Sequence, residues 1–141
     1  EICACLVGSE MCIRDRYKNL CMLASLRSDI DKEAVAEAMR RVQLDPEDKR
    51  VYRKYSLGMK QKLGIANAIM GEPDIIVLDE PINALDEASV EQVKKVLVDL
   101  RERDHLIIIA CHDREELEYL SDEIIEIKDG TVVRKQKEGV A

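Results

Sequence analysis

Two adjacent carboxylates, Asp79 and Glu80, come directly after the short apolar run Ile75–Leu78. Such a run is typical of a strand in a parallel sheet, and ligands bind these sheets at the carboxyl ends of the strands. Adjacent carboxylates are costly there unless a positive charge compensates them, and Mg²⁺ in a phosphoryl-transfer site supplies that charge. The pair therefore predicts a site for Mg²⁺ and phosphate. The structural alternative is an acidic pair that opens a surface turn at Pro81.

A second candidate phosphate site is Ser56-Leu57-Gly58, at the expected start of a helix. A serine at a helix N-terminus presents a hydroxyl group, free backbone N–H groups and the positive end of the helix dipole. The structural alternative is an ordinary capped helix, in which Ser56 only accepts a backbone hydrogen bond.

Two further residues follow predicted elements of the same sheet. Asp86 closes the tetrapeptide Asn83–Asp86 and precedes a predicted helix, where an aspartate can simply be the N-cap. His112 follows the apolar run Ile107–Cys111, again at the carboxyl end of a strand. An isolated histidine at such a place is often a structural hydrogen-bonding residue.

Taken together and in this order, these motifs resemble the second half of an ABC-type ATPase domain. The resemblance covers Tyr17–Arg134 and rests on the set, since each motif alone is of weak to moderate specificity. The matching segments are Tyr55–Gln61 for the signature loop, Ile75–Pro81 for the Walker B motif, Asn83–Asp86 for the D-loop, and His112 for the switch histidine.

The resemblance implies a role for each residue of the hydrolytic centre. Asp79 would orient Mg²⁺ through water, Glu80 would polarise the attacking water as general base, and His112 would contact the terminal phosphate. The cofactors implied are ATP and Mg²⁺.

The resemblance also implies that Ser56, Gly58, Gln61 and Asp86 reach ATP across a dimer interface. The signature departs from the common Leu-Ser-Gly-Gly-Gln form, and two residues separate Gln61 from Gly58 where the common form has none. The departures from that form are at Tyr55, Leu57 and Met59.

At the level of the whole protein, the resemblance implies an ATP-hydrolysing subunit of a transporter, with export as the direction. Its partners would be a second ABC domain, arranged head to tail, and a membrane-spanning permease that holds it at the cytoplasmic face of the membrane. The chain contains no G-x-x-x-x-G-K-[ST] phosphate loop. We therefore expect an N-terminally truncated fragment that is inactive alone. The alternatives are a soluble ABC ATPase acting on ribosomes or chromosomes, and a non-catalytic half-domain.

Composition narrows the classes of function. The 141 residues carry a net charge of −7, and the chain contains no Phe and no Trp, so neither a basic face nor a base-stacking surface for nucleic acid is expected. The longest apolar runs, such as Leu106–Ala110, are too short to span a bilayer. The five cysteines are odd in number, which favours free thiols over a disulfide framework, and their spacing completes no metal site.

The first sixteen residues are expected to be non-native. Leu6–Arg16 resembles the in-frame translation of a transposase-type sequencing adapter, with a natural flexible N-terminus as the alternative. The native sequence would then begin near Tyr17.

The rest of the chain predicts an α/β fold, a partial P-loop NTPase of the ABC type, with a mostly parallel sheet. Residues 17–55 form a small helical subdomain, residues 56–134 the C-terminal part of the ATPase core, and residues 135–141 a tail. In the subdomain, the apolar spacing predicts helices over Tyr17–Leu26 and Lys32–Gln43, the second ended by Pro46.

In the core, apolar periodicity and turn residues predict alternating helices and strands, then a hairpin at Asp129-Gly130. Without further strands, such a sheet would expose an edge and an apolar face. The predicted elements are a helix from Leu57 or Gly58 with Ser56 as its N-cap, a strand at Ile75–Leu78, a helix at Asp86–Arg103, a strand at Leu106–Ala110, a helix at Arg114–Leu120, and hairpin strands at Glu123–Ile127 and Thr131–Arg134.

Overall fold

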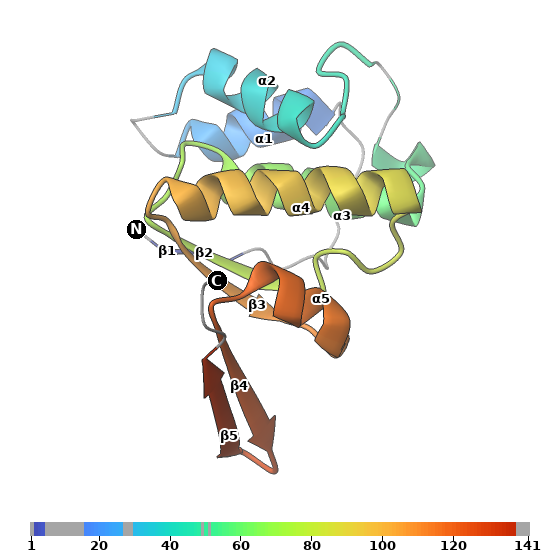
Figure 1. The fold of residues 1–141 in the computed structure, drawn as a ribbon. Coiled ribbons are helices and arrows are strands. Elements are labelled where there is room, and N and C mark those ends of the chain that lie inside the picture. The colour runs from blue at the N-terminus through green and yellow to red at the C-terminus, as the bar shows by residue number, and fades with distance from the viewer. Residues whose placement is uncertain (1, 5–15, 27–29, 49, 51, 138–141) are drawn as a thin grey trace. The chain divides into compact units, whose positions relative to one another are not determined.

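The structure is a computed structural model that describes residues 2–4, 16–26, 30–48, 50 and 52–137. It consists of two compact units, Glu1–Ala110 and Cys111–Ala141 (Figure 1). The first unit holds a parallel sheet and four α-helices, and the second holds one helix and a hairpin.

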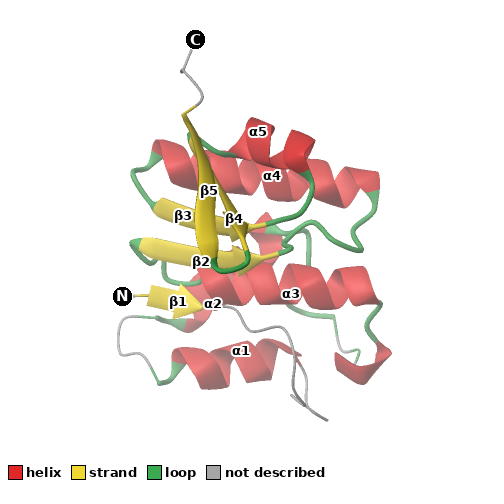
Figure 2. Cartoon of the chain, turned by 90° about the horizontal axis from the view of Figure 1, so that it is seen from below, coloured by secondary structure: helices red, strands yellow, loops and turns green. Residues whose placement is uncertain are grey.

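The sheet of the first unit has the strand order β1-β2-β3 (Figure 2). The strands are β1 (Ile2–Ala4), β2 (Ile75–Asp79) and β3 (Leu106–Ala110), and each neighbouring pair is parallel. The predicted parallel α/β arrangement is therefore confirmed. β1 lies within the sixteen residues expected to be non-native, and sequence analysis assigned it no strand. Its pairing with β2 does not test the origin of that segment, which stays a prediction.

Two helices cover one face of this sheet (Figure 1). They are α3 (Leu57–Ile69), which begins at the predicted Leu57, and α4 (Glu87–Glu102), which lies within one residue of the predicted bounds at each end. α3 contacts β1 and β2, and α4 contacts β3. The buried side chains of the two helices and of β2 make the core beneath the site. The buried residues are Leu63, Ala66, Ile69, Ile76, Leu78, Val93, Leu97 and Leu100.

The other face of β3 is open among the described residues of the first unit. The apolar run Leu106–Ala110 is typical of a strand buried on both faces, yet Leu106 is 55% and Ile108 is 49% exposed. The prediction that β3 is buried on both faces is therefore wrong. The prediction that the sheet exposes an apolar face is correct for this strand. The reason is that α4 packs against one side of this strand only.

The helical subdomain is formed by α1 (Arg16–Ala24) and α2 (Lys32–Arg41), and α2 packs on α3. The Asp31 carboxylate caps α2 by accepting a hydrogen bond of 2.8 Å from the Ala34 amide. The helix begins at the predicted Lys32 and ends at Arg41, two residues before the predicted end at Gln43; the chain turns at Gln43, whose φ is 57°, before it reaches Pro46. The predicted apolar stripe is buried in full; it comprises Val35, Ala38, Met39 and Val42.

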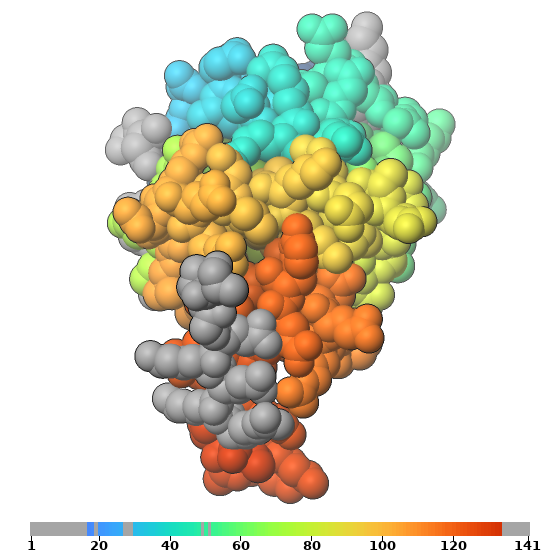
Figure 3. Space-filling model, viewed as in Figure 1, coloured from blue at the N-terminus to red at the C-terminus, as the bar shows by residue number. Residues whose placement is uncertain are grey.

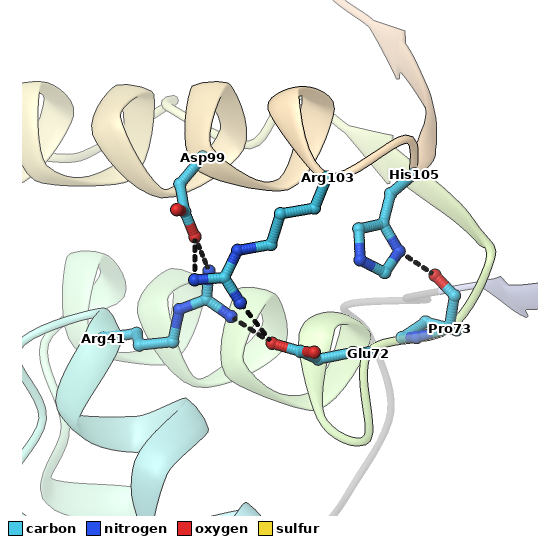
Figure 4. A network of polar contacts seen from close by, with 6 residues as sticks. All are labelled: Arg41, Glu72, Pro73, Asp99, Arg103 and His105. Atoms are coloured by element: carbon cyan, nitrogen blue, oxygen red, sulfur yellow. Dashed lines mark hydrogen bonds and ion pairs between the residues drawn. The ribbon is translucent and has the colours of Figure 1, made fainter.

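A cluster of charges joins α2 to the far ends of α3 and α4 (Figure 4). The Arg41 guanidinium lies 2.7 Å from an Asp99 carboxylate oxygen and 3.4 Å from Glu72, and Arg103 lies 3.2 Å and 3.1 Å from the same two carboxylates. Beside it, His105 Nδ1 lies 2.9 Å from the carbonyl oxygen of Pro73. In the space-filling view the atoms of α2 and α4 abut (Figure 3). The subdomain is therefore fixed to the sheet unit by charge as well as by apolar packing.

The second unit contains α5 (Arg114–Leu120) and the antiparallel strands β4 (Glu123–Lys128) and β5 (Thr131–Lys137). Asp129 and Gly130 connect the strands with φ of 50° and 75°, as the predicted primed turn requires. The predicted start of the tail at residue 135 is wrong, because β5 continues to Lys137. Residues 138–141 lie outside the described part of the chain. In the described part of the chain, no helix is both long and apolar enough to cross a membrane.

Candidate functional site

The carboxylate pair lies at the carboxyl edge of the sheet, as predicted. β2 ends at Asp79, which is exposed and is the register partner of Ala110. The next residue, half-buried Glu80, leaves the strand with a φ of 46°, and its amide donates a 2.8 Å hydrogen bond to the Ala110 carbonyl. Residues 81–84 then form a turn, so the acidic pair both ends a strand and opens a turn. The structural alternative from the sequence thus describes the same geometry.

Ser56 is the N-cap of α3. Its backbone is extended, with φ of −62° and ψ of 161°, and its Oγ accepts a 3.2 Å hydrogen bond from the Met59 amide. The side chain is also exposed. The cap prediction is confirmed, and an exposed cap hydroxyl at a helix N-terminus leaves the phosphate-site interpretation open.

Aromatic side chains fix the segment that leads into α3. Tyr55 is 5% exposed, and its ring lies 6.5 Å from that of Tyr52, in the 3₁₀ turn Tyr52–Lys54. From within α3, the Lys60 ammonium group lies 5.3 Å from the Tyr52 ring centroid, a cation–π distance. The position of Ser56 is therefore set by a buried neighbour on one side and by a helix on the other.

The first two turns of α3 lie against the loop that follows β2. A Cβ atom added at Gly58 would be 2.9 Å from the carbonyl oxygen of Ala84, so the close approach requires glycine. One turn later, Gln61 Nε2 donates a 2.8 Å hydrogen bond to the carbonyl oxygen of Glu80. The signature segment, the carboxylate pair and the D-loop segment are thus one contact cluster.

Asp86 ends this loop as the N-cap residue of α4. Its backbone has the extended N-cap conformation, but its carboxylate accepts no capping hydrogen bond from the backbone amides at the start of α4. The Ser89 hydroxyl lowers the pKa of Asp86 by hydrogen bonding, and the charge of Lys62 lowers the pKa further. Ser89 itself is 4% exposed. The charged carboxylate is therefore the favoured form at this place.

His112 is not among the residues brought together in the first unit. It belongs to the second unit, where it is exposed and directly precedes Asp113, the N-cap of α5. The Asp113 carboxylate accepts hydrogen bonds of 3.0 Å and 3.3 Å from the Glu115 and Glu116 amides. The role predicted for His112 stays a prediction.

The comparisons with known proteins agree with this arrangement. The sequence model of the family described as "ABC transporter" matches residues 7–83, more than half of the chain. The bacitracin transport ATP-binding protein BcrA of Enterococcus faecalis is 42% identical over 120 residues, which cover 84% of this chain and 39% of that protein.

The chain belongs to the ABC transporter ATP-binding family. Among its relatives, the lantibiotic transport ATP-binding protein SrtF of Streptococcus pyogenes is 29% identical over 86% of this chain and 55% of its own length. The dimeric bacterial ABC transporter cassette MJ0796 has a similar fold, with a TM-score of 0.81, 22% identity, and coverage of 95% of this chain and 61% of that one. The chain spans about two fifths to three fifths of the length of these proteins.

Two residues of the cluster in this ABC family chain were not predicted from the sequence. The Lys62 charge and the hydroxyl of buried Ser89 both act on Asp86. Helical spacing could have indicated Lys62, which is four residues after Gly58 on the same face. Ala84 belongs to the predicted D-loop segment, but no motif indicates Ser89 or the close approach of the Ala84 carbonyl to Gly58. Among the described side chains, Cys21 and Cys111 form no disulfide; the side chains of the other three cysteines lie outside the described residues.

Proposed function

We propose that this chain is part of the ATP-hydrolysing subunit of an ABC exporter. The family assignment, the named relatives for bacitracin and lantibiotic transport, and the joined signature, Walker B and D-loop segments support this proposal. The contact between Gln61 and Glu80 carries the most weight, because it joins two motifs nineteen residues apart in one local structure.

The proposed chemistry divides between the two carboxylates. Asp79 is exposed at the end of β2, so its oxygens are accessible to a hydrated cation and fit an indirect Mg²⁺ ligand. Mg²⁺ would neutralise charge on the phosphates when bound. Glu80, one residue further and half-buried, would accept a proton from the attacking water. His112 would contact the terminal phosphate.

The N-terminus of α3 is proposed to serve a second ATP molecule, held mainly by a partner domain. The exposed Ser56 hydroxyl and the backbone at Gly58 would meet the phosphates, with Asp86 of the D-loop at the interface. The MJ0796 cassette is a dimer, and this supports the pairing of two such domains; a head-to-tail arrangement is part of the proposal. The helical subdomain would dock a permease at the cytoplasmic face of a membrane.

The experiment that tests the proposal is Glu80→Gln in the complete subunit that contains these residues, with Glu102→Gln on the exposed end of α4 as matched control. We expect Glu80→Gln to lower ATP turnover by roughly 10²- to 10⁴-fold while ATP binding persists, because the general base is lost and little shape changes. The control should keep wild-type turnover. Full turnover by Glu80→Gln would contradict the proposal.

For the 141-residue chain by itself, we propose no appreciable ATP binding or hydrolysis, since its sequence holds no phosphate loop. A measured Mg²⁺-dependent turnover that Glu80→Gln abolishes would overturn this second statement.

A further inference from the structure

One face of α3 contacts the loop after β2 at successive positions. Gly58, Gln61 and Lys62 are spaced i, i+3 and i+4, so they lie on the same side of the helix. Gly58 lies against the carbonyl of Ala84, and Gln61 donates to the carbonyl of Glu80. The helix therefore holds this loop by its main chain.

The main chain of Glu80 needs such support. Its φ of 46° lies in the left-handed region, which is costly for a residue with a side chain and persists only where the surroundings fix it. Its amide donates to Ala110 at 2.8 Å, and its carbonyl accepts from the Asn83 amide at 3.1 Å and from Gln61 at 2.8 Å. Three segments thus bind the main chain of one residue: the end of β3, the turn, and α3.

We propose that Gln61 is a positioning residue for Glu80 of the same chain, and that its amide is used there instead of on ATP across the dimer. This inference rests on the proposed function, in which Glu80 is the general base. The Gln61 amide fixes the carbonyl of the residue whose carboxylate must meet the attacking water. Since α3 also presents Ser56, one helix would serve the partner's nucleotide with its first turn and its own hydrolytic centre with its second.

The chain offers a matched control for this role. Gln92 on α4 makes the same kind of bond, from Nε2 to the carbonyl of Arg41 at 2.9 Å, and it is also half-buried. Methionine in place of either glutamine keeps the length of the side chain and removes the donor. Both substitutions should therefore lower the melting temperature by similar amounts, whereas only Gln61→Met moves the hydrolytic centre.

The test is steady-state ATP hydrolysis by the complete subunit. We expect Gln61→Met to lower kcat by roughly tenfold to a hundredfold, with KM for ATP within about twofold, because a misplaced catalytic group costs rate and not ground-state binding. Gln92→Met should leave both constants unchanged. Gln61→Lys, which keeps a donor of similar reach, should recover part of kcat.

The outcomes separate the two proposals. A wild-type subunit without ATPase activity defeats the proposed function itself. With an active wild type, equal kcat values for the two methionine variants, or a rise in KM alone after Gln61→Met, overturn the positioning role. If Gln61→Met fails to fold, NMR of the wild-type subunit decides: scalar coupling between the Gln61 side-chain nitrogen and the Glu80 carbonyl carbon is expected, and its absence overturns the inference.

Discussion

The two ends of α3 are held by opposite kinds of contact. The N-terminal end meets the loop after β2 through a close approach at Gly58 and a neutral hydrogen bond from Gln61. Just beyond the C-terminal end, Glu72 takes part in a cluster of two arginines and two carboxylates (Figure 4). The first set of contacts is short and directional, and the second is a partly exposed network of charges.

This difference indicates that the two ends of one helix have different roles. A neutral hydrogen bond weakens steeply with distance and angle, so the N-terminal contacts can hold a catalytic peptide in place. In the cluster each arginine contacts both carboxylates, so the loss of one ion pair leaves the other ion pairs in place. Dissolved salt weakens those ion pairs that are exposed to solvent. Contacts at the N-terminal end would then affect both turnover and stability, whereas contacts at the C-terminal end would affect stability alone.

Among the contacts of the two ends of α3, the largest expected effect comes from Gly58→Ala. A new Cβ atom would lie 2.9 Å from the Ala84 carbonyl oxygen, so either the loop or the helix must shift. We expect turnover by the complete subunit to fall by about 10²-fold and the free energy of unfolding by about 1–3 kcal/mol. Steady-state kinetics and urea denaturation measure the two quantities.

The control for this prediction is Gly130→Ala in the hairpin turn. That glycine has a φ of 75° and no atom within 4 Å of an added Cβ, so the cost there is backbone strain. The control should lower stability and spare turnover. Equal turnover in the two variants would contradict the prediction that crowding at Gly58 affects turnover and that backbone strain at Gly130 does not.

The second prediction compares two helix caps. Ser56 and Asp31 each accept a hydrogen bond from an amide three residues later, in α3 and α2 respectively. Alanine at either position should lower the free energy of unfolding by about 1 kcal/mol. Only Ser56→Ala should also lower ATP turnover, because the Ser56 hydroxyl is proposed to meet phosphate. Similar turnover for both variants would limit Ser56 to its role as a cap.

Much of this arrangement could be predicted from the sequence, for reasons that differ between elements. The helices α3 and α4 follow from apolar spacing with Ser56 and Asp86 before their first turns, and these are local properties of the chain. The parallel pairing of β2 and β3 follows from their length and the helix between them. The motifs at the ends of these elements were therefore placed correctly.

What could not be predicted depends on tertiary contacts. The apolar run of β3 predicted burial on both faces, but burial depends on which elements cover the sheet, and Leu106 and Ile108 are exposed. The Gln61 side chain was assigned to ATP by resemblance, whereas it contacts the Glu80 carbonyl, a main-chain group that no motif records. The charge cluster unites Arg41 with residues more than thirty positions away.

The third prediction concerns that cluster. Arg41→Met removes a guanidinium that contacts two carboxylates and keeps the apolar stem, so we expect a loss of about 1 kcal/mol in the free energy of unfolding at low salt. The loss should shrink at high salt, and turnover by the complete subunit should stay at the wild-type level. Urea denaturation at two salt concentrations measures the first effect.

Arg40→Met is the matched control for Arg41→Met. Arg40 is the adjacent residue, and it contacts Glu33 and Glu37 within its own helix. It should cost less stability, because no second element depends on it. If Arg41→Met slowed hydrolysis as much as Gly58→Ala, the proposed division between the two ends of α3 would fail.

The smallest expected effect tests the influence of the Lys62 charge and the Ser89 hydroxyl on Asp86, near the N-terminal end of α3. The folded-state pKa of Asp86 lies below its ordinary value of 3.8, first because of the Ser89 hydroxyl and then, with other contributions, because of Lys62. The folded state thus favours the ionised form, and the resulting stability is present above the unfolded-state pKa and is lost as the pH falls through the folded-state pKa. Asp86→Asn should therefore be less stable than the wild type at pH 7, with a difference that shrinks below pH 3.8. Thermal unfolding of both proteins across this range measures it, and Ser89→Ala should reduce the pH dependence by removing the first cause. A difference that stays constant with pH would mean that Asp86 acts through shape alone, and that the Lys62 charge does not stabilise it.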